Sequence, residues 1–418
     1  MSKWKIYTPD GVQDILFEEC YLKRSLEQKL RTLFANCGYN ELETPTIEFY
    51  DVFASDEGAM SQENMFKFFD QQGRILVLRP DITVPVARIA ATKCKDATYP
   101  LRFSYIGNVF RYNDFGGGKQ NEFTQVGIEV LGVSTPESDA EVISIAINAL
   151  KASGLESFQV DIGQVEFFRG LMEETGLPDD ATAQVRMLID HKDYVGLEEY
   201  LNRCDIREDL KKLIFDLPAF FGSADVIDRV EALNMNKRCR DALENIRQVL
   251  KILEDYGLGQ YVSVDLGMLR GLDYDTGIIF RGFANGVGFP ILTGGRYDKL
   301  VGEFGKDCPA TGFSLGINLI MMAVQRQTDI MEKPGTDSLV CYSGKGRRTA
   351  FELCDELRRQ GLVVELDIAN SSPEAARSYA AARNIGGVIS IVDEDTVEIH
   401  YVQSGEMATV RISDLLKR

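Results

Sequence analysis

Hydrophobic residues recur in this chain with two different periods, and each period predicts a different kind of element. In residues 17–37, large apolar side chains fall at helical spacing from Leu22 to Phe34, which predicts an amphipathic helix. Gly38 follows directly and is expected to end it. Residues 75–91 begin with an apolar run and continue with a helical pattern, so they predict a buried strand that leads into a helix.

Residues 120–132 alternate between apolar and polar positions, the period of a strand with two unlike faces. One face carries Val126, Ile128 and Val130, and the other carries Gln125, Gly127 and Glu129. Glycine inside a strand often marks the close approach of another group, so Gly127 predicts a gap that a ligand fills above a polar pocket floor. The alternative is a half-exposed strand whose polar face meets only water.

The later part of the chain changes character several times. From about residue 165 to 255, charged segments carry leucine and isoleucine at helical spacing, which predicts a block of helices. Strand alternation then resumes, and we expect the glycines of residues 294–305 to form turns before a further helix. Residues 331–337 (MEKPGTD) are typical of a linker. Residues 338–418 alternate strands with helices, which predicts a small sheet with right-handed crossovers.

Composition and charge narrow the class of protein. The chain has 418 residues, of which 44% are hydrophobic, and this predicts a globular protein of about two to three domains. Its 46 basic and 64 acidic residues leave a net charge of −18, whereas nucleic-acid-binding proteins usually present a basic face to the phosphates. The excess of acid therefore argues against a nucleic-acid partner.

The composition also argues against membranes, disulfides and metals. We find neither an apolar signal segment nor the run of about 20 apolar residues that a membrane span needs, so we expect a cytoplasmic protein. The cysteines show no CxxC spacing, as is usual for reduced cysteines in the cytosol. The two histidines, His191 and His400, lie far apart in the sequence, so we expect neither a metal site nor another cofactor.

Four segments resemble sequence motifs of the class II aminoacyl-tRNA synthetases. Residues 38–53 (GYNELETPTIEFYDVF) resemble motif 1, the dimerisation element, and residues 110–132 (FRYNDFGGGKQNEFTQVGIEVLG) resemble motif 2. Residues 311–320 (TGFSLGINLI) resemble motif 3, and residues 270–280 (RGLDYDTGIIF) resemble the histidine-binding peptide of histidyl-type members. The chain is therefore similar to the histidyl-tRNA synthetase family.

This resemblance implies a fold and a domain arrangement. It implies an α+β domain over residues 1–330, in which an antiparallel sheet is flanked by helices and residues of about 165–255 form a helical insertion. Residues 331–337 are the linker, and residues 338–418 resemble the small α/β anticodon-binding domain. Residues 336–418 hold 10 basic and 13 acidic side chains, which does not favour contact with tRNA, so we interpret this domain as a relic or an interaction module.

The resemblance also implies a pocket for free histidine. That ligand offers an ammonium, a carboxylate and an imidazole, so its pocket needs an acid, a cation and groups that hydrogen-bond the ring. Asp81 and Thr83 match the positions that hold the α-amino group. Gln125 and Glu129 match positions that contact the amino group and the ring.

Further residues complete the implied pocket. Arg270 matches the cation beside the carboxylate, Tyr274 lies near it on the same segment, and Asp275 stands where the synthetases have a tyrosine that hydrogen-bonds the imidazole. Glu129 and Asp275 together would clamp the ring and raise its pKa, because nearby anions favour the protonated form. Alternatively, Asp275 turns away from the pocket, meets solvent beside a turn or pairs with Arg270.

Activation of an amino acid by ATP requires cations around the α-phosphate, and here the chain departs from the synthetase pattern. Arg111, which also belongs to the implied histidine site, matches the motif 2 arginine on that phosphate, and Phe123 matches the ring beneath adenine. Asn318 stands where motif 3 carries an arginine, and Lys119 and Asn121 replace further basic groups. Losing one such group typically costs about 10² to 10³ in rate, so we expect no efficient catalysis.

A histidine pocket beside a weakened nucleotide site resembles one branch of this family, the regulatory subunits of ATP phosphoribosyltransferase in histidine biosynthesis. The resemblance implies a non-catalytic subunit that binds free histidine for feedback control and activates a short-form catalytic subunit. It also implies a homodimer within a hetero-oligomer, with no nucleic acid and no membrane as partner. Two alternatives remain: an active histidyl-tRNA synthetase with unusual motifs, and a stand-alone amino-acid sensor that acts on another partner.

Overall fold

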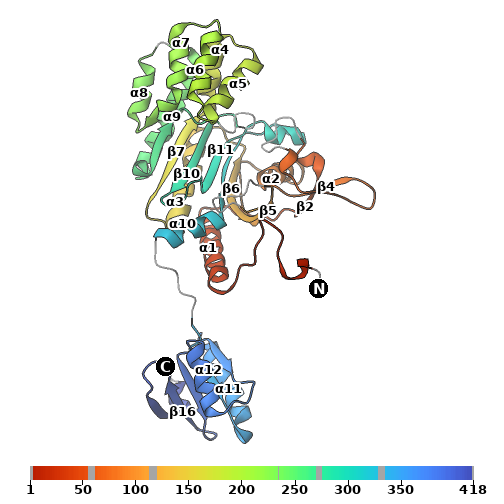
Figure 1. Cartoon of the computed structure of the whole chain (residues 1–418), viewed down its shortest axis with the longest axis vertical. Coiled ribbons are helices and arrows are strands. Elements are labelled where there is room, and N and C mark those ends of the chain that lie inside the picture. Colours follow the sequence, from red (N-terminus) through yellow and green to blue (C-terminus); the bar gives the residue numbers. More distant parts are fainter. Residues whose placement is uncertain are drawn as a thin grey trace. The chain divides into compact units, whose positions relative to one another are not determined.

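The computed structural model describes residues 3–54, 62–112, 120–233, 235–269, 275–327 and 335–416. The chain divides into Met1–Ile330, here called unit 1, and Met331–Arg418, here called unit 2. Figure 1 colours unit 1 from red to cyan and unit 2 in blue. Each unit has its own sheet or sheets and is described separately.

The main sheet of unit 1 carries nine strands within the described residues, in the order β1-β5-β6-β12-β11-β10-β7-β9-β8. Neighbouring strands are antiparallel except for β1 with β5 and β7 with β9. The predicted α+β fold with a large antiparallel sheet is confirmed. The strands, in sheet order, are Asn40–Glu41, Leu101–Phe110, Glu122–Leu131, Ala310–Gly316, Leu292–Arg296, Ile278–Ala284, Phe158–Gln164, Val262–Asp265 and Phe221–Gly222.

Three helices cover one face of this sheet, namely α1 (Phe17–Asn36), α3 (Pro136–Ala152) and α10 (Ile317–Gln327). The predicted helix α1 buries its leucine stripe and ends before Gly38, which has a φ of +84°. Phe34 of α1 meets Phe313 of β12 edge to face, with ring centroids 6.0 Å apart. The other face of the sheet is therefore free of these helices and carries the cavities described below.

The alternation predicted for β6 is confirmed, but the half-exposed alternative is wrong. Val126, Ile128 and Val130 are buried on the helix-covered face, and Gln125 and Glu129 are buried on the opposite face. The polar face is covered as well, because the start of α2 contacts Gln125 and two tyrosine hydroxyls contact Glu129.

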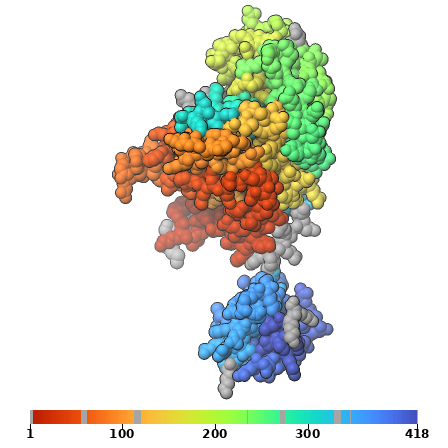
Figure 2. Space-filling view, turned by 180° about the vertical axis from the view of Figure 1, so that it is seen from behind, coloured from red at the N-terminus to blue at the C-terminus, as the bar shows by residue number. Residues whose placement is uncertain are grey.

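A second, small sheet of unit 1 has the order β2-β4-β3 and leads into helix α2 (Thr83–Thr92). Its strands are Ile47–Phe49, Ile75–Leu78 and Lys67–Phe69. The sequence predicts a buried strand for β4, yet Ile75 is 42% exposed while Val77 is fully buried. Ile75 and Val77 project from the same face of β4, so the difference lies along the strand: Ile75 pairs with Phe69 at the outer end of the β3–β4 hairpin, which projects from the unit in Figures 1 and 2.

Six helices lie between β7 and β9, at one end of unit 1, where Figure 2 shows them in yellow-green and green. Helix α4 packs against α9, and α9 also packs against α3 and β7, which joins this block to the main sheet. The helices α4 to α9 are Val165–Thr175, Asp179–Asp190, Tyr194–Arg203, Glu208–Asp216, Asp225–Glu231 and Lys237–Asp255. The short 3₁₀ helices within the described residues are Lys3–Ile6, Tyr50–Val52, Gln62–Asn64, Leu217–Ala219, Gly259–Tyr261, Leu300–Phe304 and Gly344–Gly346.

Unit 2 is a five-stranded sheet within the described residues, in the order β14-β13-β15-β16-β17, with helices on both faces. Strands β14, β13 and β15 are parallel, and β16 and β17 complete the sheet as an antiparallel hairpin. The predicted alternation of strands and helices is confirmed. The strands β13 to β17 are Ser338–Cys341, Val364–Leu366, Gly387–Ile391, Thr396–Tyr401 and Met407–Arg411, and the helices α11 to α13 are Arg347–Arg359, Pro373–Ala382 and Ile412–Leu415.

The glycines expected in turns after residue 293 lie partly inside a strand. Gly294 and Gly295 belong to β11, and Gly295 lies directly opposite Gly312 of β12. Gly312 in turn lies opposite Glu129 of β6. A glycine at these positions is needed because a neighbouring side chain or backbone group occupies the space of a Cβ, so the glycines serve close packing rather than turning.

Replacing Gly312 with alanine should destabilise unit 1. The new Cβ would lie 2.5 Å from the carbonyl oxygen of Ile128 and 2.6 Å from Cδ of Glu129, and such overpacking typically costs about 1 to 3 kcal/mol. Gly288→Ala is the matched control, because a Cβ there meets open space. Urea unfolding should show a loss of stability for Gly312→Ala alone, and equal stability of the two variants would contradict this packing.

Candidate functional site

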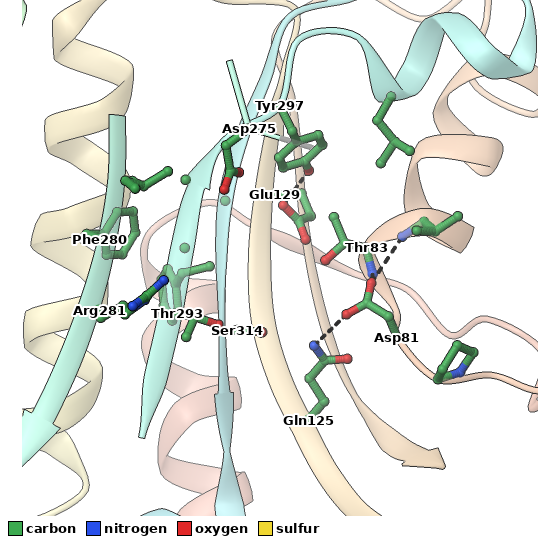
Figure 3. Close-up of a pocket in the computed structure, with 18 of the residues that line it drawn as sticks. Asp81, Thr83, Gln125, Glu129, Asp275, Phe280, Arg281, Thr293, Tyr297 and Ser314 are labelled. Carbon is green, nitrogen blue, oxygen red and sulfur yellow. Dashed lines mark hydrogen bonds between the residues drawn. The ribbon is translucent and has the colours of Figure 1, made fainter. Parts of the chain in front are cut away.

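A cavity of about 290 Å³ lies between the open face of the main sheet and the start of α2. Its lining includes Asp81, Thr83, Arg111, Gln125, Glu129 and Asp275, so the structure brings these predicted residues together. Figure 3 shows Asp81 and Thr83 on one side of the cavity, Glu129 and Asp275 at one end, and Gln125 at the other. Arg270 and Tyr274, which were also predicted, lie outside the described residues.

Asp81 and Gln125 hold each other in position on the α2 side of the cavity. One carboxylate oxygen of Asp81 accepts a hydrogen bond from the Gln125 amide at 3.0 Å, and the other accepts the backbone N–H of Thr83 at 2.7 Å. The backbone N–H of Ile82 donates to Oε1 of Gln125 at 3.1 Å. The first turn of α2 thus orients a carboxylate whose remaining acceptor capacity can meet a cation in the cavity.

Glu129 is 1% exposed and lies between two tyrosines that the sequence analysis did not include. The hydroxyl of Tyr105 donates to Oε1 of Glu129 at 3.1 Å, and the hydroxyl of Tyr297 donates to Oε2. Burial raises the pKa of Glu129 to about 8, although these hydrogen bonds act in the opposite direction. Near neutral pH this carboxyl is therefore largely protonated.

The gap predicted above Gly127 is filled by protein, so that prediction is wrong. A Cβ on Gly127 would lie 2.5 Å from the hydroxyl oxygen of Tyr105. Tyr105 lies directly opposite Gly127 on the neighbouring strand. The glycine therefore makes room for the tyrosine that hydrogen-bonds Glu129, rather than for a ligand.

Asp275 lines the cavity at the same end as Glu129, so the alternative in which it turns away is wrong. Burial raises the pKa of Asp275 well above its ordinary value, while the positive charges of Arg281 and Arg169 act against that rise. Its backbone carbonyl accepts a hydrogen bond from Arg169 at 3.1 Å. The alternative pairing with Arg270 involves a residue outside the described ones.

The wall of the cavity that lies across from Asp81 holds Arg281, Thr293 and Ser314. The sequence did not predict these three residues as part of the site. Figure 3 shows the side chain of Arg281 beside those of Thr293 and Ser314. A signal for Arg281 exists in the sequence, because a charged residue interrupts the otherwise apolar run of β10 and such residues are seldom buried without a partner. Tyr105 and Tyr297 carry no comparable signal.

A second cavity, of about 210 Å³, adjoins the first, and Arg111, Gln125, Thr293 and Ser314 line both. The guanidinium of Arg111 lies 4.8 Å from the centroid of the Phe123 ring, within the range of a cation–π contact. Among the described residues that line this second cavity, Arg111 is the one cation.

Asn318 lies in the first turn of α10 and borders the second cavity. Its amide donates to Oε1 of Gln120, and its Oδ1 accepts the backbone N–H of Thr124 at 3.4 Å. Asn121 is buried and donates to the carbonyl of Asp10 at 3.1 Å, which places it in a structural contact. Lys119 lies outside the described residues.

Metals and membranes receive no support from the parts of the chain that the structure describes. Within them, no group of three or more histidine, cysteine, aspartate or glutamate side chains is placed to hold a metal ion. None of their helices combines the length and apolar character needed to cross a membrane.

Comparison with known proteins places the chain among relatives. The sequence profile of the family described as histidyl-tRNA synthetase matches residues 11–320. A protein of Acetivibrio thermocellus, described as an ATP phosphoribosyltransferase regulatory subunit, is 61% identical over 417 residues and is covered over 100% of both chains.

Solved structures agree with these matches. An ATP phosphoribosyltransferase regulatory subunit/histidyl-tRNA synthetase from Bacillus halodurans has a TM-score of 0.84 and 32% identity, over 93% of this chain and 98% of the other. Histidyl-tRNA synthetase from Nostoc sp. PCC 7120 has a TM-score of 0.83 over 99% of both chains, but at 22% identity it is evidence for the fold alone. The chain therefore belongs to the ATP phosphoribosyltransferase regulatory subunit family, which shares the fold of the histidyl-tRNA synthetases.

Proposed function

We propose that this chain is a non-catalytic, cytoplasmic regulatory subunit that binds free histidine and is required by a short-form ATP phosphoribosyltransferase catalytic subunit. The observation that carries the proposal is the contrast between the two neighbouring cavities. The first is lined by acids, amides and hydroxyls that suit an amino acid, and in the second an arginine stacks on the aromatic ring beside it. The regulatory-subunit relatives support the same assignment.

In the proposed complex, the ammonium group of histidine binds beside Asp81 and Thr83. The carboxylate of Asp81 is already fixed by Gln125 and the first turn of α2, so little side-chain entropy is lost on binding. The imidazole ring then lies toward Glu129 and Asp275, at the end of the cavity where two acidic side chains converge. Because burial raises the pKa of both carboxyls, the expected rise in the pKa of the ring is not supported, and these groups would instead hydrogen-bond the ring nitrogens as neutral acids.

The second cavity is poorly suited to activate that histidine with ATP. Developing negative charge on a phosphoryl group needs cations arranged in advance. Arg111 lies against the face of Phe123, the ring that by resemblance would lie beneath adenine. Asn318 contributes an amide that hydrogen-bonds Gln120 and Thr124. We therefore propose that adenylation has been lost and that the pocket serves recognition.

The small sheet of unit 1 supports the proposed homodimer. Ile47, Phe49, Phe68, Leu76 and Leu78 share one of its faces, by strand register. On this face Ile47 is 49% exposed and Phe49 is 45% exposed. Exposed apolar patches of this kind mark interaction surfaces, and β2 belongs to the segment that resembles the dimerisation motif.

Histidine would regulate the complex by binding one of its states more tightly than another. A ligand shifts an equilibrium only by its differential affinity for the two states, and such couplings typically amount to about 1 to 3 kcal/mol. Feedback inhibition by histidine and activation by assembly are both compatible with this mechanism. The net charge of −18 does not favour tRNA as a partner, because nucleic-acid binding usually needs a basic face.

Asp81→Asn should weaken histidine binding by about 10- to 100-fold, because one hydrogen bond to a charged group is typically worth about 1.5 to 3 kcal/mol. Asparagine can still accept the N–H groups of α2, so the fold should be retained. Isothermal titration calorimetry measures the change, with Asp228→Asn on α8 as a control outside the cavity. The wild-type protein should show no histidine-dependent ATP–pyrophosphate exchange. Exchange at a synthetase-like rate would identify an active histidyl-tRNA synthetase instead.

Glu129→Gln should change how the stability of unit 1 depends on pH. The pKa of Glu129 is about 8 in the folded chain against an ordinary value of 4.5, so between these values the folded state holds a proton that the unfolded state has lost. The carboxyl therefore lowers stability by about 1.4 kcal/mol for each pH unit gained in this window. Urea unfolding at pH 5.5 and 7.5 should show a smaller loss in the variant, whereas parallel losses would contradict a buried neutral carboxyl.

Addition of this chain should restore activity to a short-form catalytic subunit that is inactive alone, and histidine should then inhibit the mixture. The reason is that the proposed regulatory site is supplied only by this chain. Steady-state assays measure the activity, and mass photometry measures whether the complex holds two or more copies of this chain. Activity that is independent of this chain, or a complex with a single copy, would contradict the proposed assembly. The Asp81→Asn variant should activate normally but respond to higher histidine concentrations.

A further inference from the structure

The wall of the cavity opposite Asp81 carries a row of polar side chains from three adjacent strands. Ser314 of β12 lies directly opposite Thr293 of β11, and Thr293 lies directly opposite Arg281 of β10. Directly opposed residues of an antiparallel pair project from the same face of the sheet. All three line the same cavity, so two hydroxyl groups and one guanidinium face its interior.

The spacing of the strands lets these three side chains hydrogen-bond a single group of one ligand. Neighbouring strands lie about 4.8 Å apart, so Thr293 is one spacing and Ser314 is two spacings from Arg281. An arginine side chain laid along the sheet covers that separation, and Figure 3 shows Arg281 beside both hydroxyl-bearing residues. A guanidinium and two hydroxyls are all hydrogen-bond donors, and together they fit an oxyanion.

Asp81 and Arg281 stand on different walls of the cavity, as Figure 3 shows. Asp81 belongs to the α2 side and Arg281 to the β10 side. Glu129 of β6 and Asp275, which precedes β10, are carboxyls whose pKa burial raises. Among the described residues, a further cation that borders the cavity is Arg111, which lies 4.8 Å from the centroid of the Phe123 ring. A zwitterionic ligand therefore meets the carboxyl of Asp81 on one side and Arg281 with its two hydroxyl neighbours on the other.

A simpler role for Arg281 is to compensate the buried acids around it. Its charge acts against the rise in pKa that burial imposes on Asp161, Asp265 and Asp275. Each of these acids also has another stabilising partner: Asp161 accepts the hydroxyl of Ser263, Asp265 accepts the N–H of Gly267, and Asp275 lies near the charge of Arg169. Compensation alone does not explain why Thr293 and Ser314 present hydroxyls beside the guanidinium.

We propose that Arg281, with the hydroxyls of Thr293 and Ser314, binds the α-carboxylate of the amino acid in this cavity. The assignment rests on the proposed function, because it takes histidine as the ligand. It adds a specificity-determining residue on β10 to Arg270, which by resemblance also lies beside the carboxylate. The ammonium then faces Asp81 while the carboxylate faces β10 to β12. A ligand without the carboxylate gains nothing from Arg281.

A comparison of two ligands on matched variants tests this assignment. L-histidinol keeps the ammonium and the imidazole of histidine but carries a neutral hydroxymethyl group in place of the carboxylate. Calorimetry should show that Arg281→Gln weakens histidine binding by about 10- to 100-fold, as expected for the loss of a charge-assisted hydrogen bond. The same variant should change histidinol affinity by less than about threefold, and Arg281→Lys should recover part of the histidine affinity.

Two further variants keep the test decisive. Thr293→Val keeps the shape of the side chain and removes only the hydroxyl, so it should also weaken histidine more than histidinol, even where Arg281→Gln fails to fold. Arg247→Gln on α9 removes a cation far from the cavity lining and should change neither affinity. Equal losses for both ligands, or no loss for histidine, would overturn the role of Arg281. A wild-type protein that binds neither ligand would overturn the proposed function and this assignment with it.

Discussion

The burial of the Glu129 carboxyl is the constraint on which the rest of unit 1 depends. A carboxyl removed from water is costly unless it is protonated or hydrogen-bonded. Here burial favours the protonated form, and Tyr105 and Tyr297 donate hydrogen bonds to both carboxyl oxygens. Those partners come from β5 and from the residue after β11, so the strand order must bring them to β6. Gly312 has no side chain because the carboxyl fills that space.

The two cavities differ in whether their polar groups remain available to a ligand. In the first, acids are held ready by neighbouring groups and remain available to a ligand, as Asp81 illustrates with its bonds to Gln125 and α2. In the second, the groups that would meet a nucleotide interact with one another: Arg111 covers Phe123, and Asn318 bonds Gln120. A nucleotide would have to displace these contacts, whereas an amino acid would add to contacts that already exist. Recognition and activation are thus separable within one sheet.

Sequence periodicity predicts single helices and strands, but it does not predict the contacts that depend on how strands pair. The alternation from Gln125 to Val130 and the stripe of α1 were readable because each pattern lies within one element. Glu129 meets Tyr297, and Arg281 lies beside Thr293 and Ser314, because strands distant in the sequence are neighbours in the sheet. The spacing of residues along a sequence does not reveal which strands become neighbours. The gap inferred at Gly127 was wrong for the same reason, since the filling residue comes from β5.

Likeness of fold does not choose between the functions considered for this chain. A histidyl-tRNA synthetase at 22% identity and a regulatory subunit/histidyl-tRNA synthetase at 32% identity superpose almost equally well, with TM-scores of 0.83 and 0.84. The backbone is therefore compatible with catalysis and with regulation alike, and function resides in the side chains placed upon it. Here β12 and α10 form with an amide at residue 318, and an amide offers no positive charge to a phosphate. Because side chains at such a place can change while the backbone keeps its course, the proposed histidine pocket does not require a working nucleotide site beside it.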